Sequence, residues 1–283
     1  MSRISVLMPA RNAATTIFAA AKSTLRALPS DGELFVYDDG STDETLREID
    51  KVTDKRLHVV QGKGNIGVSG ALNLLLASTD SDYVARMDAD DLTLPGRFSA
   101  QLSAVQGEAD VVFGGIINFG KDIRGLRPSW PHKLSPEVMA LALLVSNPVA
   151  HSTMFAKRER LASAGGYRGC RAEDYDFWLR LAANGTQLVR LARPVVAYRH
   201  HSGQVTSARG WFEMAFREGE VQESLQALSM KLLGVPIDQP AKALETFSHC
   251  AARFGGADKS YLLRRARERF GDEINGKVRE GDY

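Results

Sequence analysis

The chain has 283 residues, of which 44% are hydrophobic and 25% charged, a globular composition long enough for one large domain with an appendage. The net charge of +2 excludes a strong global attraction to nucleic acid. No apolar run approaches the roughly 18 residues that span a bilayer, and Met1 precedes an expected strand instead of a signal peptide. Cys170 and Cys250 are the only cysteines, and they lack metal-ligand spacing. We therefore expect a cytoplasmic protein, at most peripheral to the inner face of a membrane.

Apolar segments alternate with helical patterns through the first part of the chain. The predicted strands are 4–8, 33–37, 57–61 and 83–87, and the helices between them are 14–28, 41–51 and 67–77. This alternation predicts an α/β fold, a mostly parallel sheet flanked by helices. Ligands of such sheets bind at the carboxyl ends of the strands. Each predicted strand ends in polar residues or glycine, so we expect the ligand site where these ends converge.

Three carboxylates, Asp88, Asp90 and Asp91, follow the fourth strand directly. Like charges held this close repel, and a bound divalent cation would remove the conflict. Oxygen ligands of this kind suit Mg²⁺ or Mn²⁺. The alternative is an acidic loop tip that precedes a helix opened by Pro95.

Asp38 and Asp39 end the second strand. They could cap the next helix, but Ser41 and Glu44 form a capping box that would already serve this purpose. The two extra carboxylates would then accept hydrogen bonds from a base N–H group or from ribose hydroxyls.

Three glycines, Gly62, Gly64 and Gly67, match the dinucleotide-binding pattern between a strand and a helix. This pattern would make the protein an NAD(P)-dependent oxidoreductase. The motif follows the third strand instead of the first, and the neighbouring aspartates would repel a diphosphate. We therefore keep the oxidoreductase as the alternative.

A second polar group opens a predicted helix in the later part of the chain, where strands are expected at 111–114, 153–155 and 195–198. Glu173 and Asp174 could complement the helix dipole, or one of them could act as a general base toward an acceptor hydroxyl. His200 and His201 follow the last predicted strand, where an imidazole could complete a metal site or remain a surface group.

The residues after Trp211 show helical spacing of apolar side chains, which predicts an appendage of three helices with a polar tail after Gly271. Four arginines lie in the last helix, either as a solvated face or as a surface attracted to anionic lipid head groups. The appendage could instead shape an acceptor pocket or form a homo-oligomer.

Together these motifs resemble those of the family 2 glycosyltransferases, which have the GT-A fold, over roughly residues 4–207. Gly165-Gly166-Tyr167 followed by Glu173-Asp174 resembles the family's acceptor-side turn and catalytic motif. Asp88-Ala89-Asp90-Asp91 resembles its metal-binding DXD motif, with Pro95 and Arg97 also in pattern. The nucleotide-binding residues implied by the resemblance are Pro9, Ala10, Arg11, Asn12, Asp38, Asp39, Asn65, Gly67, Asp88 and Ala89. Arg11 stands where the family usually has an aromatic residue.

The resemblance implies a metal-dependent, inverting sugar transfer from a nucleotide-diphosphate sugar, with UDP or dTDP as the expected nucleotide, to a saccharide or lipid-linked acceptor. Asp90, Asp88 and His201 would hold Mg²⁺ or Mn²⁺, and Asp174, beside Glu173, would be the base. The catalytic domain would span residues 1–207, with a nucleotide-sugar half at 1–105 and an acceptor half at 106–207. Residues 208–283 would form the helical extension. A non-catalytic sugar-nucleotide-binding protein is a further alternative, against which the intact acidic pair argues.

Overall fold

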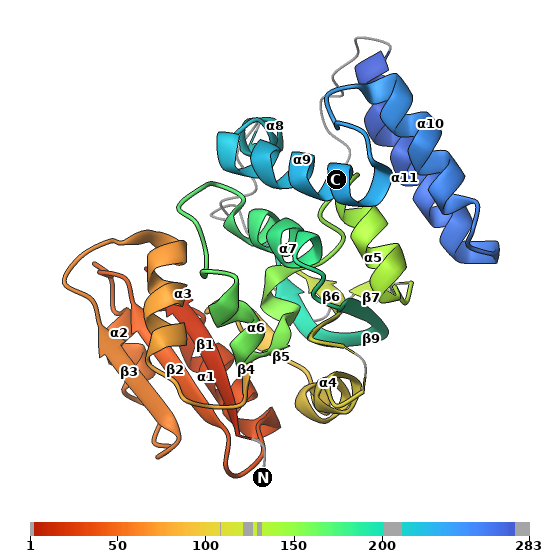
Figure 1. Ribbon diagram of the computed structural model, residues 1–283. Helices are drawn as coiled ribbons and strands as arrows, with labels where there is room; N and C mark the ends of the chain where they lie inside the picture. The colour runs from red at the N-terminus through yellow and green to blue at the C-terminus, as the bar shows by residue number, and fades with distance from the viewer. Residues whose placement is uncertain (1–2, 108, 121–126, 129–131, 201–210, 275–283) are drawn as a thin grey trace.

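The computed structural model describes residues 3–107, 109–120, 127–128, 132–200 and 211–274 (Figure 1). Strands and helices alternate through the first half as the sequence predicted. The elements in order are β1 (Ile4–Ala10), α1 (Ile17–Ala27), β2 (Glu33–Asp38), α2 (Thr45–Ile49), β3 (Leu57–Gln61), α3 (Gly67–Ala77) and β4 (Tyr83–Arg86). Strands β1 to β4 pair in parallel in the order β3-β2-β1-β4, so their carboxyl ends lie at one edge of the sheet.

The second half extends this sheet with strands of both directions. It contains β5 (Leu92–Thr93), α4 (Arg97–Val105), β6 (Val111–Phe119), β7 (Arg127–Pro128), α5 (Pro136–Leu143), the short 3-10 helix η2 (His151–Thr153), β8 (Phe155–Lys157), α6 (Arg158–Ser163), α7 (Glu173–Ala183) and β9 (Leu188–Arg199). Strand β8 joins β4 in the antiparallel direction, and the sheet continues through β6 and β9 to β5. Strands β6 and β9 run parallel, and β7 pairs with β6 off the main order.

Each face of the sheet carries its own hydrophobic core, as the alternation of side chains along β1 requires. Ile4, Val6 and Met8 face a core that includes residues of α1, α2 and α4. Leu7 faces the larger core, which is built with α3, α5, α7 and the C-terminal helices. This two-sided covering explains why the first strands are continuous apolar runs.

Between residues 211 and 274, the described part of the C-terminal region, the chain forms four helices instead of the predicted three: α8 (Trp211–Phe216), α9 (Gly219–Leu233), α10 (Pro240–Ala251) and α11 (Gly256–Ile274). Helix α9 packs along α7. Helices α10 and α11 lie side by side, on the opposite side of the view from β3 (Figure 1). Among the described helices, none combines the length and the apolar character needed to cross a bilayer.

The three strands predicted in the second half differ from the observed ones. The strand expected at 111–114 continues to Phe119. The strand expected at 195–198 begins earlier, at Leu188, because Arg190 and Pro194 interrupt the apolar pattern, although both still pair with β6 across shifts in register. The strand expected at 153–155 begins at Phe155, since His151–Thr153 form the 3-10 turn that leads into it. Residues 121–126 and 129–131, and the end of the polar tail from residue 275, fall outside the described residues.

Candidate functional site

Hydrogen bonds join the loops that follow β1 and β2 at the carboxyl edge of the sheet. Asn12 takes a left-handed conformation, with φ of 50°, which asparagine tolerates better than most residues. Its Oδ1 accepts the Thr42 N–H at 2.9 Å, and its own N–H is donated to Ser41 Oγ at 2.9 Å. The capping-box prediction for Ser41 is therefore wrong. Helix α2 begins at Thr45, whose N–H is donated to Asp43 Oδ1 at 3.0 Å.

Asp39 holds the start of α3, not the helix that follows it directly. Its Oδ1 accepts the Ile66 N–H at 2.7 Å, and its Oδ2 accepts the Gly67 N–H at 2.9 Å. Gly67 has φ of 76°, and it also donates to Asn65 Oδ1 at 3.1 Å. A dinucleotide diphosphate would need these same helix N–H groups, which a carboxylate already occupies. The geometry therefore contradicts the oxidoreductase interpretation of the three glycines.

Asp38 is buried beside the end of β1, where it pairs in register with Ala10. Its Oδ2 accepts the Ser41 N–H at 3.2 Å. Its Oδ1 is buried and has no hydrogen-bond partner among the described residues. A buried carboxylate oxygen without a partner is costly, so a ligand N–H or hydroxyl group would satisfy it. Pro9 lies half-buried and Arg11 exposed on either side of Ala10.

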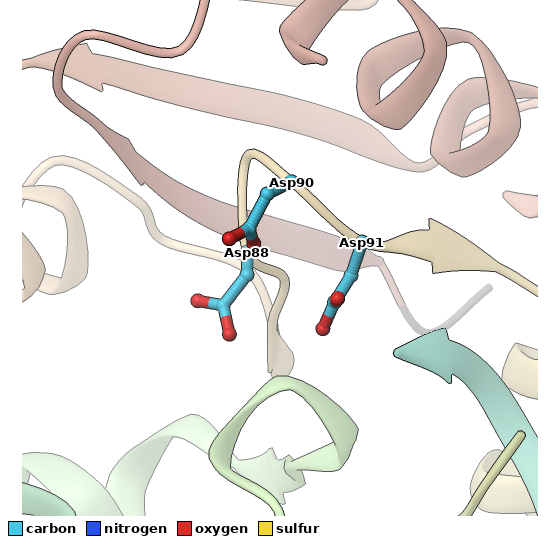
Figure 2. Close-up of side chains that lie close together, drawn as sticks. All are labelled: Asp88, Asp90 and Asp91. Atoms are coloured by element: carbon cyan, nitrogen blue, oxygen red, sulfur yellow. The ribbon is translucent and has the colours of Figure 1, made fainter. Parts of the chain in front are cut away.

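Asp88, Asp90 and Asp91 surround the turn between β4 and β5, and Figure 2 shows their carboxylates gathered on one side of it. One ligand oxygen from each lies within 4.8 Å of the others. Asp91 is only 1% exposed, and Ala89 is buried between Asp88 and Asp90. Oxygen ligands this close suit a divalent cation such as Mg²⁺ or Mn²⁺. The chemistry of these side chains therefore fits the metal that the sequence predicted.

Electrostatics within this turn favour the same interpretation. Burial raises the pKa of Asp88 to about 6, with the Arg86 guanidinium opposing the rise and Asp90 adding to it. Burial also raises the pKa of Asp91, and the charges of Asp88 and Asp90 raise it further. These are the shifts of crowded carboxylates, and a cation among them would stabilise their ionised forms.

Buried Arg97 fixes the strand that carries this turn. Its Nη2 donates to the carbonyl oxygens of Arg86 at 2.8 Å and Met154 at 3.2 Å, and its Nε donates to Gln101 Oε1 at 3.0 Å. Burial lowers the pKa of Arg97 to about 9. Arg97 thus links the last residue of β4 to Met154, the residue before β8, and so fixes the strand end from which the acidic turn begins.

The end of β9 closes the acidic turn from the other side. The Arg199 N–H is donated to Asp91 Oδ1 at 2.8 Å, and Arg199 Nε donates to the Asp90 carbonyl oxygen at 2.8 Å. His200 is exposed, with its Nε2 2.9 Å from Asn118 Oδ1. His201, the predicted third metal ligand, lies outside the described residues.

The predicted base lies at the first turn of α7. Asp174 Oδ2 accepts a hydrogen bond from Asn147 Nδ2 at 2.9 Å, and Oδ1 accepts the Tyr175 N–H at 2.7 Å. Burial raises the pKa of Asp174, and the neighbouring Glu173 charge raises it further. Burial raises the pKa of Glu173 as well, against the effect of Arg86. Both carboxyls are therefore better proton acceptors when ionised than surface carboxylates are.

His151 and Arg86 lie beside these carboxyls. His151 Nδ1 is 3.6 Å from Glu173 Oε1, and its Nε2 is 3.1 Å from the Tyr167 hydroxyl. Burial lowers the pKa of His151 well below its usual value, so its imidazole is neutral at pH 7. Arg86 forms an ion pair with Asp88, and its charge also acts on Glu173. Arg86 is thus shared by the acidic turn and the start of α7.

The two halves of the site are joined through Asn73 of α3. Its Nδ2 donates to the Tyr167 carbonyl oxygen at 2.8 Å, and its Oδ1 accepts the Tyr167 N–H at 2.8 Å. Gly166 lies so close that an added Cβ would be 2.4 Å from Asn73 Oδ1, and its φ is 72°. Both requirements explain the second glycine of the Gly165-Gly166 pair.

Sequence reasoning missed Asn147, His151 and Arg86. Arg86 stands inside an apolar strand, where a lone charge is a usable signal of a buried partner. Asn147 precedes a proline and so has the pattern of an ordinary turn residue. Neither Asn147 nor His151 is near α7 in sequence, so only the fold brings them to the two carboxyls.

Comparison with known proteins decides the family. Residues 5–165 match the model of glycosyl transferase family 2. The chain belongs to glycosyltransferase family 2. The amylovoran biosynthesis glycosyltransferase AmsE of Erwinia amylovora is 30% identical over 212 residues, which cover 74% of this chain and 78% of the relative. The Escherichia coli UDP-Glc:alpha-D-GlcNAc-diphosphoundecaprenol beta-1,3-glucosyltransferase WfaP is 28% identical over 229 residues, which cover 80% and 87% of the two chains.

Solved structures place this glycosyltransferase in the GT-A fold that the sequence predicted. S. aureus TarS 1-349, solved in complex with UDP-GlcNAc, aligns with a TM-score of 0.62 at 19% identity, covering 100% of this chain and 94% of that one. The mannosyltransferase PcManGT from Pyrobaculum calidifontis, in complex with GDP-Man and Mn²⁺, aligns with a TM-score of 0.59 at 20% identity, covering 94% and 80%.

Proposed function

We propose that this glycosyltransferase transfers a sugar from a nucleotide-diphosphate sugar to an acceptor hydroxyl, with inversion at the anomeric carbon and with Mg²⁺ or Mn²⁺ bound. The observation that carries the proposal is the pairing of two acidic groups around Arg86. Arg86 forms an ion pair with Asp88 of the acidic cluster, and its charge also acts on Glu173, the neighbour of the hydrogen-bonded Asp174 carboxyl. The first suits a metal diphosphate and the second suits a base.

On the donor side, the nucleoside would lie against the loops after β1, β2 and β3. Asp38 has a free buried oxygen, and each carboxylate oxygen of Asp39 keeps a second lone pair, so either could accept a base N–H. Asp90 would hold the cation, and Asp88 would share it or hold the ribose. When bound, the cation would supply Lewis-acid stabilisation of the charge that develops on the departing diphosphate.

On the acceptor side, Asp174 would take the proton of the acceptor hydroxyl as its oxygen attacks the anomeric carbon. The bond from that carbon to the diphosphate oxygen breaks as the new glycosidic bond forms, and the nucleoside diphosphate leaves. Displacement in one step from the opposite face inverts the configuration. Glu173, whose Oε1 lies 3.6 Å from His151 Nδ1, would remain beside the base without taking the proton.

The relatives support a class of substrate. AmsE is named for amylovoran biosynthesis, and WfaP is named for transfer from UDP-Glc to a diphosphoundecaprenol-linked sugar. We therefore propose a role in bacterial polysaccharide synthesis with a UDP- or dTDP-sugar donor and a saccharide or lipid-linked acceptor. Such an acceptor would place the enzyme in the cytoplasm at the inner face of the membrane. We also propose residues 1–207 as the catalytic domain and 208–283 as an extension that shapes the acceptor site or forms an oligomer.

Calorimetry of donor binding tests the metal and the donor together. UDP-, dTDP- and GDP-sugars would be titrated with Mn²⁺ and then with a chelator, and we expect tight binding with the cation and weak residual binding in the chelator. Asp90→Ala should weaken binding on the order of 100-fold in Mn²⁺ and leave the residual binding in chelator unchanged. Asp50→Ala, which removes an exposed carboxylate at the end of α2, is the matched control. Equal weakening by Asp90→Ala in chelator would remove the metal from this site.

A further inference from the structure

We infer that Asn147 is a positioning residue for the proposed base: its side-chain amide orients the Asp174 carboxylate and holds it ionised at the pH of the reaction. The inference rests on the proposed function, since it assigns a role relative to that base. Asn147 lies in the segment between α5 and η2, and its Nδ2 is 2.9 Å from Asp174 Oδ2.

The direction of this hydrogen bond is fixed by a second contact of the same amide. Asn147 Oδ1 accepts the Val149 N–H at 3.4 Å, so the NH₂ group of the side chain is the end that faces Asp174. An amide NH₂ donates and carries no charge. It therefore stabilises the carboxylate form of Asp174 and offers no proton that the reaction could consume.

The segment that carries Asn147 is held from two sides. Arg190 of β9 donates from Nη1 to the Pro148 carbonyl oxygen at 2.6 Å, and the Tyr175 hydroxyl donates to the Leu143 carbonyl oxygen. With the Tyr175 N–H on its other oxygen, Asp174 has both oxygens fixed in direction. One lone pair on each oxygen stays open for a hydroxyl proton.

The other groups around Asp174 cannot supply this donor. Glu173 beside it on α7 is negative and opposes its ionisation. His151 of η2 is buried, with its Nε2 engaged by the Tyr167 hydroxyl and its Nδ1 3.6 Å from Glu173 Oε1. A charge on this imidazole would lower the pKa of Asp174, but burial lowers the pKa of His151 well below its usual value and keeps the ring neutral. Arg86 of β4 is paired with Asp88. Asn147 is therefore the one neutral side-chain donor to this carboxylate among the described residues.

Two variants separate positioning from folding through the pH profile of kcat. Asn147→Ala removes the donor, so the pKa of the base rises and the acid limb of kcat should move up by about one pH unit. Asn147→Asp keeps the shape but places a second carboxylate against Asp174, so the two share a proton and the acid limb should move by about two units. In both variants kcat should recover as the pH rises. The affinity for the nucleotide-sugar, measured by calorimetry, should stay within about twofold of the wild-type value.

The controls make each outcome decisive. Gln187→Ala removes a side-chain amide bonded to the Gly185 carbonyl oxygen, directly before the start of β9 and at the opposite end of that strand from Arg199, and should leave the profile unchanged. Asp174→Asn tests the base itself: if it still turns over, the proposed function fails and not only this inference. If Asp174→Asn is inactive but both Asn147 variants keep the wild-type acid limb, the inference is overturned. A loss of kcat that is uniform with pH, or a loss of donor binding, would equally overturn it.

Discussion

The acidic turn after β4 and the start of α7 both hold neighbouring carboxylates that repel one another. The two regions compensate this repulsion differently. Asp88, Asp90 and Asp91 are crowded against one another, with Arg86 and the Arg199 N–H as partial compensation. At the start of α7, the carboxyl of Asp174 is compensated by neutral donors, the Asn147 amide and the Tyr175 N–H. The first arrangement still invites a cation. The second keeps a single carboxylate available for a proton.

A third carboxylate sharpens the contrast, because it lies only two residues from Asp174 on the same helix. Asp176 is fully buried, yet it is surrounded by donors from Arg168, Arg180 and Ser224. Burial works to raise its pKa, but these donors outweigh it and hold the pKa below the usual value. The same helix therefore carries the proposed base, whose pKa is raised, and a structural carboxyl, whose pKa is lowered, and the two differ in their hydrogen-bond partners.

The largest expected effect comes from removing the negative charge of the proposed base, Asp174. Asp174→Asn should lower kcat on the order of 1000-fold, because the acceptor hydroxyl loses its proton acceptor. Donor binding measured by calorimetry with Mn²⁺ should be unchanged, since the acidic turn is untouched. Near wild-type turnover would mean that Asp174 is not the base, and that the two acidic groups do not have the separate roles proposed for them.

The matching exchange at the structural carboxyl should act on stability instead. Asp176→Asn leaves Arg168 and Arg180 without their charged partner and should lower the free energy of unfolding by about 3 kcal/mol, measured in urea at pH 7. Because the folded-state pKa of Asp176 lies below the usual value of 3.8 for an aspartate, its contribution to stability is present above about pH 4 and is lost as the pH falls through the folded-state pKa. The difference between variant and wild type should therefore shrink below pH 4. A difference independent of pH would point to packing and not charge.

A smaller effect is expected where the two regions are joined. Asn73→Ala removes both hydrogen bonds to the Tyr167 backbone and should lower the free energy of unfolding by about 2 kcal/mol. Thermal unfolding measures this directly, and Ser78→Ala, which removes a bond within α3 alone, is the control. If Asn73→Ala is no more destabilising than Ser78→Ala, the hydrogen bonds between α3 and the Tyr167 backbone do not hold the two halves of the site together.

The sequence predicted the sheet and the strand ends because both are local properties. Continuous apolar runs from Ile4 and from Tyr83 stop at polar residues, so the edge that carries Asp38, Asp39 and the acidic turn follows from the pattern alone. Strand β9 was predicted too short because Arg190 has its partners, the His132 and Pro148 carbonyl oxygens, at 58 and 42 residues' distance.

The roles within the site depend on contacts of the same long range. Asp39 has the pattern of a cap for α2, and it holds α3 instead, 27 residues away. Asn147 bonds to Asp174, 27 residues away in the sequence, and no helical or strand periodicity of the sequence predicts this contact. A pattern can therefore nominate the residues that carry charge at the site, while the neutral residues that tune them become visible only when the chain is folded.

The Ser224 hydroxyl of α9 donates to Asp176 Oδ1 at 2.7 Å, and Arg168 reaches from the glycine turn to Glu223 at 2.8 Å. This contact limits how such enzymes can be recombined. A chimera that exchanges only the chain after residue 210 for a relative's would separate Asp176 from its hydroxyl donor unless the incoming helix supplies another. Helices α7 and α9 should therefore be exchanged together, so specificity grafts between relatives should cross over before Arg168.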